Sequence, residues 1–126
     1  MLSETDITTL VAVKDLDEAK AFYEEKLQLV RADEGPGWAQ YRSGTTHLII
    51  YASELAGTNK ASTAVWTVSD VDATVRELKA SGVSSFQQYD DLPGTTRDGD
   101  IHSSGVVKMA WFKDPSGNIF EVNGRS

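Results

Sequence analysis

The most constraining feature of this sequence is an internal repeat, in which a strand-like run, an Asp and an amphipathic helical pattern occur twice. Residues 7–13 are rich in Thr, Val and Leu and precede Asp15, and residues 63–68 precede Asp70 in the same way. Each Asp stands where a helix needs an N-cap. Apolar residues follow at spacings of three or four, as helices packed on a sheet require, and these are Leu16, Ala19, Phe22, Tyr23 and Leu27 in the first copy and Val71, Val75 and Leu78 in the second. The repeat therefore predicts two similar modules, at about residues 5–52 and 61–124.

Turn-forming residues divide the rest of each module into short strands, so each module is predicted to be β-α-β-β-β. Neither module can bury both its sheet face and its helix alone. We therefore expect one α+β domain over residues 1–126, with a curved mixed sheet, helices on the outside and a cleft on the concave side.

A tight hairpin is predicted at residues 114–118, whose sequence is D-P-S-G-N. Pro115 presets its own φ, Gly117 permits a positive φ, and Asp114 and Asn118 can hydrogen-bond within the turn. This hairpin would deliver the last strand, which carries Glu121. The second helix has a stop signal at Gly82, whereas the first ends near residue 28 without a glycine.

The second module is longer than the first, since 47 residues separate Asp70 from Gly117 and only 29 separate Asp15 from Gly44. Most of the surplus lies at residues 89–105, which contain three glycines, His102 and no apolar periodicity. We expect a mobile polar loop there that covers the cleft or, alternatively, serves assembly. Its carboxylates favour a cationic ligand, and they belong to Asp90, Asp91, Asp98 and Asp100.

Composition excludes several classes of function. The chain has no cysteine, so disulfides, thiolate metal sites and cysteine nucleophiles are ruled out. A formal net charge of −7 disfavours nucleic acid as a partner. No apolar run is long enough for a membrane span, and residues 1–6 lack the pattern of a secretory signal, so we expect a cytoplasmic protein with no membrane partner.

Three segments carry a resemblance to a known family: V-K-D-L-D-E-A-K-A-F-Y at residues 13–23, V-S-D-V-D-A at 68–73, and F-K-D-P-S-G-N-I-F-E-V at 112–122. In these the sequence resembles the vicinal oxygen chelate superfamily, the fold of glyoxalases, bleomycin-resistance proteins and extradiol dioxygenases. The resemblance implies paired βαβββ modules, a cleft for a small molecule and a homodimer.

Metal-dependent members of that superfamily have two ligand positions per module, commonly His, Gln or Glu. The matching positions here hold Thr8, Leu48, Thr63 and Glu121, so only Glu121 keeps a ligand type. His47 lies beside Leu48 but belongs to the opposite face of its strand. One carboxylate does not hold a catalytic divalent ion, so we expect no metal and no other cofactor.

Alternation along the strands predicts which residues face the cleft. Trp38 and Gln40 share one face, as do Met109 and Trp111, while His102 would approach from the long loop. The full set of expected ligand-binding residues is Trp38, Gln40, Thr63, Val65, Thr67, His102, Met109, Trp111 and Glu121. Glu121 would act as a hydrogen-bond acceptor or a counter-charge for the ligand. Alternatively, it would form an ion pair with a neighbour such as Arg42 or Lys108.

Three functional hypotheses follow. The first is a metal-free protein that binds or sequesters a small cationic or aromatic molecule, similar to the bleomycin-resistance branch. The second is a metal-dependent lyase, isomerase or dioxygenase that uses Glu121 with His47, His102 or Gln40. The third is a structural or regulatory module with a vestigial cleft. No catalytic residue is identified.

Overall fold

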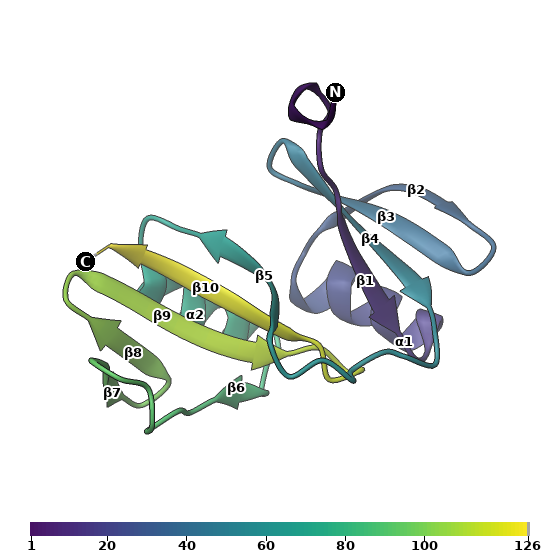
Figure 1. The fold of residues 1–126 in the computed structure, drawn as a ribbon. Coiled ribbons are helices and arrows are strands. Elements are labelled where there is room, and N and C mark those ends of the chain that lie inside the picture. The colour runs from purple at the N-terminus through teal and green to yellow at the C-terminus, as the bar shows by residue number, and fades with distance from the viewer. Residues whose placement is uncertain (126) are drawn as a thin grey trace.

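Two mixed β-sheets, one from each predicted module, form the body of the chain (Figure 1). The computed structural model describes residues 1–125. The first module contains β1 (Thr9–Val13), α1 (Leu16–Ala21), the π-helical η2 (Phe22–Lys26), β2 (Val30–Gly35), β3 (Trp38–Ser43) and β4 (Thr46–Ala52). Its strands run in the order β1-β4-β3-β2, with β1 parallel to β4. A short 3-10 helix, η1 (Leu2–Glu4), stands clear of this body in Figure 1.

The second module repeats this plan with an additional hairpin. It contains β5 (Ser62–Thr67), α2 (Val71–Ala80), β6 (Phe86–Gln87), β7 (Thr96–Asp98), β8 (Ile101–Ser104), β9 (Val107–Lys113) and β10 (Ile119–Arg125). The strand order is β5-β10-β9-β8-β7, β5 is parallel to β10, and β6 pairs with β9. The predicted α+β fold with two related modules is confirmed. No helix within residues 1–125 is long and apolar enough to cross a membrane.

The ends of the helices follow the local chemistry of the sequence. Asp15 Oδ1 accepts a hydrogen bond from the Glu18 amide at 3.0 Å, and Asp70 Oδ1 accepts one from the Ala73 amide at 3.0 Å, so both predicted N-caps are confirmed. Gly82 ends the second helix with a φ of +108°. Gln28 has a φ of +59° after the first helical segment, a conformation that is costly for a residue with a side chain.

One core is shared by the helix-side faces of both sheets. Its buried members include Val11, Val13, Tyr41 and Ile50 from the first sheet and Phe112, Phe120 and Val122 from the second. The ring of Tyr23 in η2 lies between the sheets, 6.1 Å from the ring of Tyr41 and 6.1 Å from that of Phe120. Successive side chains of a strand point to opposite faces, so the other face of each sheet turns away from this core. We call these two surfaces the open faces.

The predicted turn at residues 114–118 is confirmed, and it also joins the two modules. The Asn118 amide donates to Asp114 Oδ1 at 2.8 Å, and Gly117 has a φ of +92°. Across the modules, the Tyr23 hydroxyl donates to Asp114 Oδ2 at 2.7 Å, and Asn118 Nδ2 donates to the Ala12 carbonyl at 2.7 Å. The turn therefore acts as a buried connection between the two halves of the chain.

The expectation of a polar loop over residues 89–105 is wrong for residues 96–104, which form the β7–β8 hairpin and extend the second sheet beside β9. Two ion pairs hold it near its turn: Arg97 Nε in β7 contacts Asp90 Oδ1 at 2.8 Å, and Lys79 Nζ in α2 contacts Asp100 Oδ2 in the turn at 2.5 Å. The surplus residues of the second module therefore form a hairpin of the sheet at 96–104 and, before it, a segment without strands whose Tyr89 packs on His102 and Trp111.

Candidate functional site

The open face of the second sheet gathers most of the predicted ligand-binding residues in cross-strand rows. In one row, Val65 is the partner of Glu121, and Glu121 is the partner of Trp111. In the next row, Thr67 pairs with Asn123 and Asn123 with Met109. Thr63 lies on the same face by alternation, beside an irregularity in the β5–β10 register.

The open face of the first sheet holds the other two predicted residues. Trp38 is the cross-strand partner of Tyr51, and Gln40 is the partner of Ile49. The indole of Trp38 lies against the backbone of Gly35, because a Cβ added at Gly35 would fall 2.5 Å from the indole Nε1. The structure thus brings the predicted residues together in two groups on two separate open faces. None of the four main crevices within residues 1–125 is lined by both groups.

A hydrogen-bonded chain orients Glu121 on its open face. The hydroxyl of Thr67 donates to Asn123 Oδ1 at 2.8 Å, and Asn123 Nδ2 donates to Glu121 Oε2 at 2.8 Å. The expected pairing of Glu121 with Lys108 is wrong, because Lys108 Nζ contacts Asp72 Oδ2 at 2.6 Å. Sequence reasoning missed Asn123, although its position two residues after Glu121 on the same strand was a usable signal.

His102 is fully buried in β8, so its expected position in a loop that closes over a ligand is wrong. Its Nε2 accepts a hydrogen bond from the Tyr89 amide at 2.9 Å, and its Nδ1 lies 3.2 Å from the Asp100 carbonyl. Its ring packs edge-on against Trp111, with centroids 4.8 Å apart. Both nitrogens are engaged, and His102 packs beside Trp111 on the open face, where Tyr89 contacts both rings.

The residues at the four family ligand positions do not fit a divalent-metal centre. Leu48 is 4% exposed and belongs to the shared core, whereas His47 pairs with Arg42 across the open face. Leu48 faces the core whereas Glu121 faces the open side of its sheet, so the alignment that matches these two residues is wrong. Among residues 1–125, no three His, Asp or Glu side chains gather closely enough to hold a metal ion.

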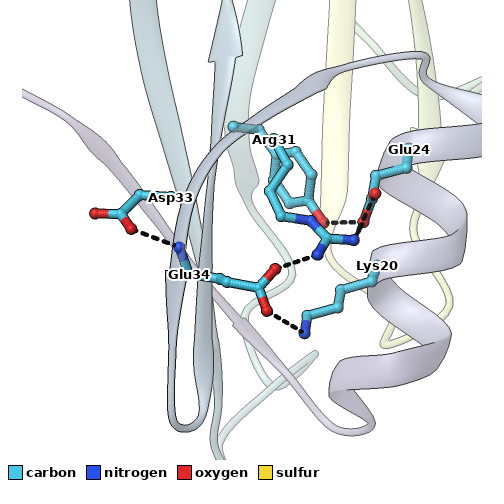
Figure 2. Close-up of polar contacts among 6 residues, drawn as sticks. Lys20, Glu24, Arg31, Asp33 and Glu34 are labelled. Atoms are coloured by element: carbon cyan, nitrogen blue, oxygen red, sulfur yellow. Dashed lines mark hydrogen bonds and ion pairs between the residues drawn. The ribbon is translucent and has the colours of Figure 1, made fainter.

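A second polar cluster lies on the helix side of the first sheet and is structural (Figure 2). Arg31 in β2 binds both carboxylate oxygens of Glu24 at 2.6 and 2.7 Å and also contacts Glu34, while the Tyr41 hydroxyl donates to Glu24 at 2.7 Å. Burial opposes ionisation of Glu24, but the hydrogen bonds from Arg31 and Tyr41 outweigh it and lower the pKa of this carboxyl. The cluster fastens edge strand β2 to the helical segment and is turned away from the open face.

Comparison with known proteins identifies the architecture. The family model of the Glyoxalase/Bleomycin resistance protein/Dioxygenase superfamily matches residues 7–122. A bleomycin-binding protein in complex with bleomycin is similar in structure, with a TM-score of 0.70, 20% identity and coverage of 96% of this chain and 98% of that chain. The fosfomycin resistance protein FosX from Listeria monocytogenes gives a TM-score of 0.69 and 15% identity, with coverage of 96% of this chain and 93% of that chain.

An antibiotic binding protein, TnmS3 from Streptomyces sp. CB03234, gives a TM-score of 0.63 and 22% identity, and the match covers 96% of this chain and 97% of that chain. The search of curated proteins gave no match. At these identities the solved structures are informative about the fold alone.

Proposed function

Since the chain belongs to the glyoxalase, bleomycin-resistance and dioxygenase superfamily, we propose that it binds and sequesters a small molecule in an aromatic-lined cleft without a metal ion. One observation carries this proposal. The open faces carry the partly exposed rings of Trp38 and Tyr51 on one sheet and Glu121 beside the largely buried Trp111 on the other, the combination of aromatic surface and few polar groups that is typical of small-molecule sites. The bleomycin-binding protein and TnmS3 support this assignment by similarity of fold.

A second copy of the chain completes the cleft in this proposal. The two open faces turn away from the shared core, so neither one is closed by the other within one chain. Each carries an exposed apolar residue on an edge strand, Leu10 on β1 at 60% exposure and Val65 on β5 at 50%. In a homodimer, the first open face of one copy would cover the second open face of its partner and bury these side chains.

The ligand in this proposal is cationic or aromatic. Glu121 is oriented by Asn123 and stands next to Trp111, and a carboxylate beside an aromatic ring suits a ligand with a positively charged nitrogen. The acidic residues before β8 attract a cationic ligand less strongly than their number suggests, because Asp90 is paired with Arg97 and Asp100 with Lys79. The preference for a cation therefore rests mainly on Glu121.

The competing function is a metal-dependent lyase, isomerase or dioxygenase, and one observation favours it. His47 rather than Leu48 faces the open side of its strand, so His47 of one copy and Glu121 of another could approach one cleft. Calorimetric titration of the protein with Zn²⁺, Ni²⁺, Mn²⁺ and Fe²⁺ separates the two functions. Metal-free binding predicts no saturable heat, whereas stoichiometric binding that is lost in Glu121→Ala would establish the competing function.

A further inference from the structure

A crevice of about 300 Å³ lies between the two modules on the helix side of the sheets. The first module contributes residues 26–29 and Ser43, and the second contributes α2 together with Trp66, Val68 and neighbouring core residues. None of the predicted ligand-binding residues lines this crevice. It is therefore separate from the open faces, and an inference about it does not depend on the proposed function.

The floor of the crevice is aromatic. The ring of Trp66 stacks on that of Phe112 with centroids 6.3 Å apart and an interplanar angle of 16°, and it also contacts the ring of Phe120 at 5.3 Å. Trp66 is only half-buried, although its neighbours Phe112 and Phe120 are fully buried, so part of its indole surface stays uncovered. The walls are mainly apolar and include Leu27, Leu29, Val68, Leu78 and Val122.

The polar residues at the crevice are Lys26, Gln28, Ser43, Thr74, Glu77 and Ser81. The hydroxyls of Thr74 and Ser81 already donate to backbone carbonyls, whereas Ser43 has an unused donor. Ser43 Oγ accepts a hydrogen bond from Trp66 Nε1 at 2.9 Å, and within residues 1–125 the hydroxyl proton of Ser43 has no acceptor. Lys26 and Glu77 carry opposite charges at the crevice, and neither forms an ion pair with another described residue. Their charges offset each other, which disfavours a ligand of either net charge.

We infer that this crevice is a binding site for a small neutral aromatic molecule that carries one hydrogen-bond acceptor. An apolar cavity of about 150 Å³ in another protein holds benzene, so the volume here accommodates a substituted single ring. The ring of the ligand would lie on the uncovered surface of Trp66, and its acceptor would receive the free proton of Ser43. Because both modules line the site, the bound molecule would contact both.

The test is a chemical-shift titration of isotope-labelled protein with acetophenone, a neutral aromatic ketone. We expect saturable shifts at Ser43, the Trp66 indole N–H and Leu78, with the signals of the open-face residues Trp38 and Trp111 unchanged. Ethylbenzene, which has nearly the same shape and no acceptor, should bind more weakly. In Ser43→Ala the affinity for acetophenone should fall about threefold to tenfold, while that for ethylbenzene stays the same.

A filling substitution gives a second readout. Thr74 lines the crevice from α2, so Thr74→Phe should weaken acetophenone binding at least tenfold. Arg76→Phe adds the same ring on the same helix at an exposed position that does not line the crevice, and it should leave binding unchanged. Absence of saturable shifts in the wild-type protein, shifts confined to the open faces, or equal binding by the folded Thr74→Phe protein would overturn the inference. If Thr74→Phe fails to fold, the Ser43→Ala comparison decides the question.

Discussion

Asp114 shows how a single buried side chain can hold two distant parts of this chain together. Its carboxylate accepts hydrogen bonds from the Tyr23 hydroxyl, from the amides of Ser116 and Asn118 and from Asn118 Nδ2. Asp114 is only 4% exposed, and these four donors replace the hydrogen bonds to water that its carboxylate loses on burial. The turn that Asp114 organises then fixes the second module against the first.

The first prediction concerns the backbone of this turn. Gly117 has a φ of +92°, and a Cβ there would meet only ordinary contacts, so the cost of a side chain is conformational rather than steric. Gly117→Val should lower the free energy of unfolding by roughly 1 to 3 kcal/mol, measured by urea denaturation. Gly117→Asn should recover part of this loss, since Asn tolerates a positive φ. An unchanged midpoint for Gly117→Val would contradict this account of the turn.

The second prediction concerns pH. Burial, followed by the nearby Asp114 carboxylate, raises the pKa of Tyr23 above its usual value of about 10. The stabilisation linked to the neutral hydroxyl is therefore complete below about pH 10 and decreases as the pH rises further.

At about pH 11, this group should lower the free energy of unfolding by about 1.4 kcal/mol relative to pH 8. Tyr23→Phe should be less stable at pH 8, because it removes a buried hydrogen bond, but it should lose less stability between pH 8 and pH 11. Denaturation at both pH values measures the difference, and equal losses in the two proteins would rule out this role of Tyr23.

Residue-scale features were predictable where they are local in sequence. The N-caps at Asp15 and Asp70 and the conformation of Gly117 follow from neighbouring residues alone. The contact between Tyr23 and Asp114 joins residues 91 positions apart, and nothing in its neighbourhood distinguishes Tyr23 from another apolar residue of the helix.

At the scale of elements, the β7–β8 hairpin is the main departure from the prediction. All three residues of β7 are polar and exposed, so this strand shows no alternation of apolar and polar residues. A usable signal was present nonetheless, because Gly99-Asp100 places a glycine at the first central position of a two-residue hairpin turn, and Gly99 has a φ of +62°. Only the fold reveals that His102, which follows this turn, is buried under Tyr89 and against Trp111.

The third prediction tests this hairpin by hydrogen exchange. Amides of β8 that pair with β9 should exchange at least tenfold more slowly than those of the exposed residues 91–94, because ladder hydrogen bonds protect them. Lys79→Ala, which removes the ion pair to Asp100, should speed exchange in the hairpin and leave β4 of the other sheet unchanged. Similar exchange in β8 and in residues 91–94 would restore the interpretation of a mobile loop.

At the scale of the whole molecule, the grouping of the predicted ligand residues was foreseeable, but their separation on two faces was not. Alternation correctly placed Met109 with Trp111 and Trp38 with Gln40, because strand geometry alone determines it. Which faces of the two sheets meet depends on where the helices pack. That arrangement follows from the shared core around Tyr23, which no local pattern specifies.

The fourth prediction concerns assembly. Leu10 is exposed on an edge strand of the first open face, so Leu10→Asp should shift the protein from dimer to monomer without unfolding it. Leu55 is also exposed, at 73%, but it lies in the connection between β4 and β5 and belongs to neither open face, so Leu55→Asp is the matched control and should stay dimeric. Sedimentation velocity distinguishes the two states, and a wild-type monomer would rule out a cleft between copies.

The proposed site is metal-free, holds a small molecule and is built by two copies of the chain together. Native mass spectrometry of the protein purified from cells tests it most directly, because one spectrum reports assembly, metal and retained ligand. We expect a dimer of the 13.7 kDa chain with no bound metal, and any retained mass should be an organic molecule that is lost in Trp38→Ala. A monomer, or about one metal ion per chain that disappears in Glu121→Ala, would contradict it.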